Sequence, residues 1–241
     1  LQTAQTSGTA LCTIVNIDGS FSRRTGAQLA IAHDGTTVGS LSDGCLEKQL
    51  ATEVLDARHL KEKRLLRFGS GSPYIDFRLP CGSGLDILVD PTPDLTSIRV
   101  VLDQLDQRIE AALNLPIPLN APDGFLCVRH YIPRLKIMVF GEGPELSSFV
   151  AAASAIGNDI EYFDKQSKDM ALGRLPPAIS ADAWTAIVLL FHDHEWERAL
   201  LGWALRTPAF YIGAQGGEKA RKDRLTDLLS QGVSQEAISR L

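Results

Sequence analysis

Short glycine-rich segments beside charged residues are the parts of this sequence whose types and spacing best suit chemistry. Gly141-Glu142-Gly143-Pro144 directly follows an apolar run that predicts a strand and directly precedes a predicted helix. A tight glycine turn at such a junction lets backbone N–H groups approach a phosphate, and the helix dipole favours the negative charge. We therefore expect Gly141, Gly143 and Pro144 to bind a phosphorylated ligand.

Asp164 ends the next predicted strand, about 20 residues after this turn, where a dinucleotide-binding fold places its partner for a ribose hydroxyl. Leu146, however, stands where the dinucleotide fingerprint has its third glycine. The pattern therefore favours a site for a phosphorylated ligand over the alternative, a Rossmann-like fold whose ligand crevice is empty or degenerate. Whether the ligand is a nucleotide or NAD(P) stays open.

Two further predicted strands end in polar or glycine-rich segments. His192-Asp193-His194 follows one, and the segment from Gly213 to Gly217 follows the other. The carboxyl ends of strands in such a sheet face the ligand. We expect a polar role for His192; the alternatives are a metal site and a solvated loop in which Asp193 caps the next helix. Gly213 and Gly216 predict a second anion-binding edge or, alternatively, a plain turn.

The first half of the chain holds a loop with paired arginines between two predicted strands. Small residues and arginines together suit an anionic ligand, although a solvated charged loop has the same composition. The residues that we expect to bind a ligand here are Ser20, Arg23, Arg24 and Gly26.

Two cysteines of the first half lie beside glycines. Gly44-Cys45 opens a predicted helix, and Cys81-Gly82 lies in the glycine-rich segment 69–84. A thiol near a helix N-terminus has a lowered pKa and ligates soft metals. We expect Gly44, Cys45, Cys81 and Gly82 to contact a cofactor, with both thiols as metal ligands; the alternative is that each cysteine is a small buried residue.

Alternating strands and helices must position these residues. In the first half the apolar patterns predict one helix among several strands, at 9–17, 28–32, 36–40, 44–60 (the helix), 63–68 and 85–89. In the second half, strands at 135–140, 159–163, 184–191 and 209–212 alternate with helices at 146–156, 195–205 and 218–231. Alternation of this kind predicts a parallel sheet with helices on both faces. The fold class is therefore α/β, a mixed α+β N-terminal domain followed by a C-terminal Rossmann-type domain.

The domain boundaries follow from a change in composition. Residues 91–133 are rich in proline and include one amphipathic segment at 95–113, so we interpret them as a linker with a helix. The N-terminal domain then covers 1–90 and the Rossmann-type domain covers 134–241.

The composition of the chain argues against several classes of protein. The 241 residues carry a formal charge of −5 without a cluster of Lys and Arg, which argues against a nucleic-acid surface. No apolar run approaches the length of about 20 residues that a membrane span needs, and no signal peptide is recognisable, so we expect a cytoplasmic protein. The four cysteines form no CxxC pair, so neither a zinc site nor a disulfide framework is expected, and Cys12 is predicted to pack in the core.

Taken in order, these segments resemble one family, the XdhC/CoxI family of xanthine dehydrogenase accessory factors. In the first half the resemblance is carried by Gly19-Ser20-Phe21-Ser22-Arg23-Arg24-Thr25-Gly26-Ala27, Asp43-Gly44-Cys45-Leu46-Glu47 and Cys81-Gly82-Ser83. In the second half it is carried by Gly141-Glu142-Gly143-Pro144-Glu145, His192-Asp193 and Tyr211-Ile212-Gly213-Ala214. The order holds from about residue 11 to 230, nearly the whole chain.

The resemblance implies a function. Members of this family are thought to bind molybdenum cofactor (molybdopterin) and to help its sulfuration with a cysteine desulfurase. They then insert it into a molybdoenzyme apoprotein resembling xanthine dehydrogenase or carbon monoxide dehydrogenase. A cofactor-binding chaperone is thus expected rather than an enzyme, and turnover is left open. A homodimer is implied by resemblance alone.

Two alternatives remain. One is an NAD(P)-dependent oxidoreductase that uses the Gly141 turn and Asp164, with His192 as the proton donor. The other is a divergent non-catalytic binding protein, favoured by Asp43, which stands where the family pattern has a glycine.

Overall fold

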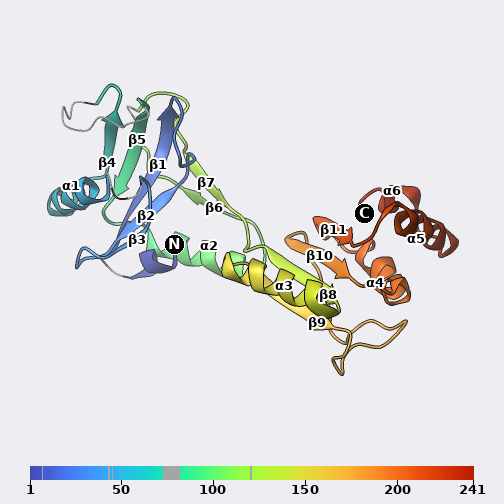
Figure 1. Ribbon diagram of the computed structural model, residues 1–241. Coiled ribbons are helices and arrows are strands. Elements are labelled where there is room, and N and C mark those ends of the chain that lie inside the picture. The colour runs from blue at the N-terminus through green and yellow to red at the C-terminus, as the bar shows by residue number, and fades with distance from the viewer. Residues whose placement is uncertain (7, 43, 45, 73–81, 120) are drawn as a thin grey trace. The chain divides into compact units, whose positions relative to one another are not determined.

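The structure, a computed structural model, describes residues 1–6, 8–42, 44, 46–72, 82–119 and 121–241 (Figure 1). The chain divides into two compact units, Leu1–Ile132 and Pro133–Leu241. Each unit has its own sheet and its own apolar core, and each is described by itself.

The first unit is built on an antiparallel sheet with the strand order β3-β2-β1-β5-β4. Its strands are β1 (Ala10–Asp18), β2 (Gln28–Ile31), β3 (Thr37–Gly39), β4 (Arg64–Gly69) and β5 (Gly84–Asp90). Each lies where the apolar pattern predicted a strand. The central pair, β1 and β5, is rich in β-branched and aliphatic residues, which suit a sheet buried on both faces.

One face of this sheet is covered by α1 (Glu47–Leu60) (Figure 1). Strand residues alternate between the two faces, so Cys12 and Ile14 of β1 point toward the helix and pack with its Leu50 and Val54. Cys12 is fully buried, which confirms the prediction that it packs in the core. Burial raises the pKa of the Cys12 thiol to about 12, so it stays protonated at neutral pH.

The opposite face is covered by residues that come later in the chain. These form α2 (Leu95–Asp106), β6 (Ala111–Asn114) and β7 (Val128–Tyr131). Ala4 of the short N-terminal η1 (Gln2–Gln5) packs with α2 and β6 on the same face. All of them belong to the first unit, and α2, β6 and β7 occupy the region that the sequence led us to expect as a linker with a helix.

The helix expected at 95–113 is shorter than predicted, because α2 ends at Asp106. Arg108 adopts the left-handed conformation with φ of 61°, which a continuing right-handed helix does not allow. Ala111 and Leu113 are buried and alternate with exposed neighbours in β6, which pairs with β7. This pattern of period two was missed because it follows the helical pattern directly.

The second unit is a parallel sheet with the strand order β11-β10-β8-β9, which confirms the Rossmann-type prediction. Its strands are β8 (Lys136–Gly141), β9 (Asp159–Asp164), β10 (Thr185–Leu190) and β11 (Tyr211–Ala214). They alternate with α3 (Gly143–Ala155), η2 (His194–Trp196) with α4 (Glu197–Ala204), and α5 (Glu218–Ser230), and α6 (Gln235–Ile238) follows.

Strand β8 lies between β9 and β10, so the chain leaves β8 to one side and later returns on the other. This reversal puts the carboxyl ends of β8 and β10 side by side at the position where sheets of this class bind ligands. In the described part of the chain, no helix has the length and apolarity needed to cross a membrane.

Candidate functional site

The turn between β8 and α3 depends on its first glycine. A Cβ atom on Gly141 would lie 2.6 Å from the carbonyl oxygen of Leu190 on β10, a distance that real side chains do not reach. The same carbonyl oxygen accepts a hydrogen bond from the N–H of Glu142 at 3.2 Å, and the carbonyl of Gly141 accepts one from Lys165 at 2.9 Å. Gly143 then adopts a φ of 71°, which favours glycine. The turn predicted for phosphate binding is therefore fixed by the close approach of neighbouring strands.

Charged side chains surround this turn. Lys165 lies 3.1 Å from a carboxylate oxygen of Glu142, and its ammonium lies 5.1 Å from the centre of the Trp196 ring. His192 Nε2 lies 3.5 Å from Glu145 Oε1, so the structure brings the end of β10 against the first turn of α3. The side chain of Glu142 does not cap α3. The N-terminus of α3, which carries the positive end of the helix dipole, therefore has the carboxylates of Glu142 and Glu145 beside it. Lys165 and His192 are the basic side chains that contact these carboxylates.

The features expected of a dinucleotide site are only partly present. Asp164 ends β9 as expected, but its Oδ1 accepts a hydrogen bond from the N–H of Gln166 at 2.8 Å and so supports a turn. Leu146, at the position of the third glycine, is 2% exposed and lies on the buried face of α3. In the dinucleotide fingerprint this position is a glycine so that helix and strand can pack closely.

His194, whose side chain is 42% exposed, lies beside a buried ion pair that the sequence did not reveal. Arg224 on α5 donates from Nε and Nη2 to the carboxylate of Glu197 on α4, at 2.6 and 3.1 Å. His194 Nδ1 lies 3.3 Å from both Arg224 Nη2 and Glu197 Oε2. Arg224 also donates to the carbonyl of Gln215, directly before Gly216. These contacts therefore join the segments that follow β10 and β11.

The two histidines after β10 thus have different partners, His192 on α3 and His194 on α4 and α5. Between them, Asp193 accepts a hydrogen bond from the N–H of Glu195 at 3.1 Å and caps η2, the plain role foreseen for it. Across the residues that the structure describes, no three His, Cys, Asp or Glu side chains gather in a way that could hold a metal ion. The alternative of a metal site at His192 and His194 is not supported.

Gly213 lies in β11 and Gly216 follows it, so both are at the end of this strand, as expected. Gly213 belongs to the strand, and a Cβ atom there would lie 2.6 Å from the hydroxyl of Tyr211. Gly216 has a φ of 141°, and a Cβ atom there would lie 2.9 Å from that of Ala220. The backbone conformation of Gly216 thus requires glycine, whereas a side chain at Gly213 would displace the exposed ring of Tyr211.

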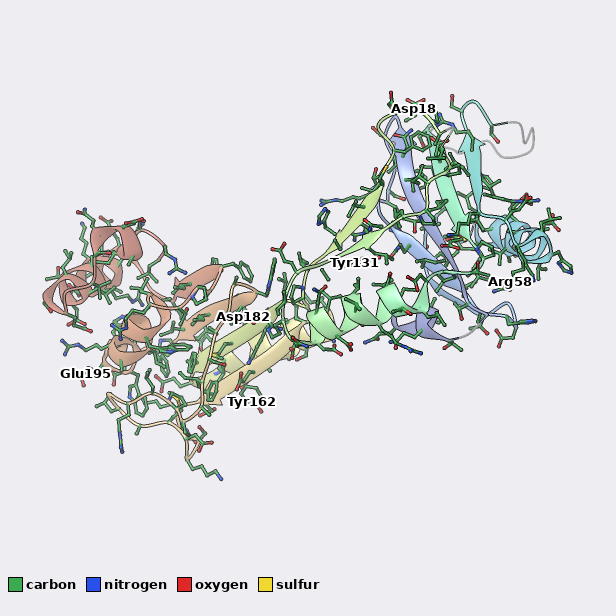
Figure 2. All side chains as sticks on the ribbon, turned by 180° about the vertical axis from the view of Figure 1, so that it is seen from behind. Asp18, Arg58, Tyr131, Tyr162, Asp182 and Glu195 are labelled. Carbon is green, nitrogen blue, oxygen red and sulfur yellow. The ribbon has the colours of Figure 1, made fainter. Side chains whose placement is uncertain are left out.

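In the first unit, two of the predicted loops meet at one end of the sheet. A Cβ atom on Gly19 would lie 3.5 Å from that of Ser83, so the segment with Ser20 lies beside the segment with Gly82. Figure 2 marks this end of the sheet by Asp18, the last residue of β1. The structure therefore brings together two of the segments that were predicted to bind one ligand.

Arg67 of β4 holds this end of the sheet together. Its guanidinium contacts Asp18 at 3.0 Å, Asp86 at 2.7 Å and the carbonyl of Ser70 at 2.8 Å. A Cβ atom on Gly84 would lie 2.1 Å from Arg67 Nη2, so the guanidinium passes directly over that glycine. Arg67 was not foreseen, because one arginine in an apolar strand pattern gives no signal by itself.

The arginine loop is closed by Gly26. Its N–H donates to the carbonyl of Ile14 at 2.7 Å, and its own carbonyl accepts from Arg129 Nε of β7 at 2.8 Å. Gly26 has a φ of 88°, and a Cβ atom there would lie 2.7 Å from Arg129 Cδ. Within this loop Ser20 and Arg24 are exposed and Arg23 is half-buried. Gly26 thus shapes the loop, and the exposed side chains are available to a ligand.

The loop that leads into α1 is organised by Glu47. Among the described residues, its carboxylate accepts hydrogen bonds from the backbone N–H groups of Leu41, Ser42 and Gly44 at 2.8–3.0 Å. It also accepts hydrogen bonds from the hydroxyls of Ser40 and Ser42 at 3.0–3.1 Å. Burial alone would raise the pKa of Glu47, but the N–H groups of Ser42 and Leu41 outweigh it and bring the pKa to about 2. Glu47 is therefore ionised at neutral pH and holds Gly44 in place.

Cys45 and Cys81, the predicted metal ligands, lie outside the described residues, as does Asp43. The neighbours of Cys45 in the chain are described on both sides. Gly44 donates to Glu47, and the N–H of Leu46 donates to the hydroxyl of Ser42 at 2.8 Å.

Comparisons with known proteins agree with this architecture. The model of the XdhC and CoxI family matches residues 3–69, and the model of the XdhC Rossmann domain matches residues 137–241. The molybdenum cofactor insertion chaperone PaoD of Escherichia coli (strain K12) is 30% identical over 247 aligned residues, covering 97% of this chain and 75% of that protein.

A solved structure is also similar. The crystal structure of a protein from Bacillus halodurans, described as a xanthine dehydrogenase, superimposes with a TM-score of 0.73 at 18% identity. The superposition covers 93% of this chain and 83% of that chain. At this identity the likeness concerns the fold.

Proposed function

Because this chain belongs to the XdhC and CoxI family, we propose that it binds molybdenum cofactor and inserts it into a molybdoenzyme apoprotein. The observation that carries the proposal is the similarity to a molybdenum cofactor insertion chaperone along 97% of the chain. A match through both units supports a shared function more strongly than a match to one glycine turn.

The chemistry of the first unit is compatible with this cargo. Molybdopterin carries a phosphate, and the exposed Arg24 and Ser20 offer a guanidinium and a hydroxyl to it beside the Gly82 segment. It also holds a soft metal, for which thiolates are good ligands. We assign that role to Cys45 and Cys81, with Gly44 held by Glu47 next to the first of them.

In the second unit, Gly141, Gly143, Pro144 and His192 remain the proposed contacts. Since Glu142 and Glu145 already lie at the start of α3, a dianionic phosphate is less favoured there than in the arginine loop. Lys165, which the sequence did not single out, is the base best placed to offset these carboxylates. We therefore propose that this turn contacts a less charged part of the cargo.

The finer parts of the function are proposed on the resemblance. They are assistance in sulfuration together with a cysteine desulfurase, a client resembling xanthine dehydrogenase or carbon monoxide dehydrogenase, and action as a homodimer. Each can be tested with the purified chain.

The first experiment is equilibrium dialysis of the full chain with released molybdenum cofactor, without oxygen, with NADPH and ATP in excess as competitors. Saturable binding that neither nucleotide displaces supports the proposal. Absent cofactor binding together with tight NADPH binding would instead favour an oxidoreductase.

Paired variants make this test specific to the arginine loop. Replacing both Arg23 and Arg24 by glutamine should weaken cofactor binding at least tenfold, because the phosphate loses charge-assisted hydrogen bonds. Arg99→Gln, on the exposed face of α2, is the matched control and should bind normally. Equal affinity in all of these proteins would remove the arginine loop from the site.

A further inference from the structure

The first unit contains a cavity of about 240 Å³ on the face of its sheet that points away from α1. Leu11 and Thr13 of β1 line it together with Leu88 and Asp90 of β5. They share one face because Leu11 is paired with Asp90 and Thr13 with Leu88 across the ladder. The cavity is therefore part of the sheet's second face rather than a gap in a loop.

Apolar residues from two separate clusters line much of the cavity, and Thr13, Ser97 and Asn114 add uncharged polar groups. On one side Ile98 of α2 and Leu113 of β6 pack with Leu11. On the other side Leu115 packs with Leu88. The cavity therefore has apolar residues on both sides, Leu11 and Leu88 from the sheet and Ile98, Leu113 and Leu115 from the segments that cover it. Such walls suit a flat ring.

Asp90 places a carboxylate in this space. The residue is 5% exposed, and its Oδ1 accepts a hydrogen bond from the N–H of Thr92 at 3.1 Å. Its Oδ2 lies 3.8 Å from the ammonium of Lys63, which is beyond hydrogen-bond distance. Burial raises the pKa of Asp90, and Lys63 and the Thr92 N–H oppose that shift. A buried carboxylate with unused hydrogen-bonding capacity needs donors.

Of the other charged groups that line the cavity, Asp94 already has hydrogen-bond partners, and the ammonium of Lys63 can reach a ligand. Asp94 is occupied as the N-cap of α2, accepting from the N–H of Thr96 at 2.9 Å and the hydroxyl of Ser97 at 2.6 Å. Lys63 stands at the rim with 42% of its side chain exposed. Asp90 and Lys63 therefore offer, side by side, an acceptor for N–H groups and a donor for a carbonyl oxygen.

We propose that this cavity binds a planar 2-amino-4-oxopyrimidine ring, the group that pterins and guanine share. Its amino N–H and the adjacent ring N–H would pair with Asp90, its carbonyl oxygen with Lys63, and its faces with the leucines. Cavities that hold drug-sized molecules measure about 300–1,000 Å³, so the volume here suits one small ring system.

This site is distinct from the loops that we propose for the cofactor's phosphate. None of the residues that line the cavity belongs to those loops. The inference therefore goes beyond the proposed function.

The test measures binding of pterin and of GMP to the full chain by equilibrium dialysis, with lumazine and IMP as matched analogues that lack the 2-amino group. We expect pterin, GMP or both to bind at least tenfold more tightly than the matched analogue. Pterin alone would identify the pterin as the source of the ring, and GMP alone the nucleobase. The proposal is overturned if pterin and GMP bind no more tightly than lumazine and IMP, or if neither pterin nor GMP binds. This result needs only the wild-type chain.

Variants then locate the site. Asp90→Asn keeps the size and the acceptor for Thr92 but presents an N–H group to the ligand's donors, so affinity should fall at least tenfold. Asp103→Asn, on the exposed part of α2, is the control and should bind normally. An Asp90→Asn protein with an unchanged melting temperature and unchanged affinity would also overturn the proposal. Molybdenum cofactor binding, measured in parallel, reports on the proposed function separately.

Discussion

The backbone N–H of Gly44 donates a 2.8 Å hydrogen bond to Oε2 of Glu47, three residues further along the chain. This bond lets the first turn of α1 organise the loop that precedes it. Because the same carboxylate also accepts from Leu41 and Ser42, the loop is tied at several points to one side chain. The glutamate of the family pattern thus has a physical role that the pattern alone does not reveal.

Glu47→Gln is expected to lower the free energy of unfolding by roughly 1–3 kcal/mol, because one of its acceptor oxygens becomes an N–H donor facing other donors. It should also weaken cofactor binding. Urea denaturation measures the first effect, and equilibrium dialysis measures the second. Asp56→Asn, exposed on the same helix, should change neither. Unchanged stability in Glu47→Gln would mean that the loop does not depend on the carboxylate.

The contribution of Glu47 should depend on pH. Its pKa is lowered from 4.5 to about 2 in the folded chain, so the folded state holds the proton less tightly than the unfolded state does. The resulting stability is present above about pH 4.5 and is lost as pH falls toward 2. Denaturation of the wild type and of Glu47→Gln between pH 3 and pH 7 should therefore show a difference that shrinks below about pH 4.5. A constant difference would contradict the lowered pKa.

Gly141→Ala should destabilise the second unit by about 1–3 kcal/mol, because the new Cβ atom would press on the carbonyl of Leu190. Gly217 is the matched control, since its φ is −81° and a Cβ atom there meets nothing within 4 Å. Gly217→Ala should alter the free energy of unfolding by less than about 1 kcal/mol. Chemical denaturation compares the two, and equal losses would mean that the strands do not approach so closely.

Arg224→Met should destabilise the second unit by about 3–5 kcal/mol, because it leaves the carboxylate of Glu197 buried at 1% exposure without its guanidinium. Lys222→Met removes the exposed pair with Glu218 on the same helix and should change stability by less than about 0.5 kcal/mol. The comparison is made by calorimetry. Similar melting temperatures for both variants would contradict the buried ion pair.

Thiol labelling checks the burial of the cysteines. In a chain with Cys45 and Cys81 replaced by serine, the exposed Cys127 should react quickly at pH 8, whereas the buried Cys12 should react only after denaturant is added. Mass spectrometry of the labelled chain identifies the site. Fast labelling of Cys12 without denaturant would contradict the position of β1 in the core.

Helices and strands whose apolar residues follow one clear spacing could be predicted from the sequence. Elements whose limits depend on contacts with residues far along the chain could not. The apolar runs of β8 and β10 and the alternation of helices and strands led directly to the parallel sheet. The end of α2 was misplaced because the helical pattern runs directly into β6, whose partner β7 lies further along the chain. Local patterns carry no information about such pairing.

The candidate site was predictable in the same way. Gly141 and Gly26 were chosen from their turns, and the structure explains both by atoms far along the chain, on Leu190 and Arg129. Arg67 and Arg224 were missed because their partners lie on other elements, so no spacing within one segment reveals them. Asp90, which lines the cavity, was not singled out, because one acidic residue beside a predicted strand gives no signal by itself.

The two faces of the first sheet become covered at different times during synthesis. Residues up to Asp90 supply all strands of this sheet together with α1, so one face can close early. The other face, with Leu11 and Leu88, waits for α2, β6 and the segment around Leu115. A nascent or truncated chain ending near residue 90 would therefore present an apolar surface to chaperones or to aggregation, and an independently folding first unit has to extend to about residue 132.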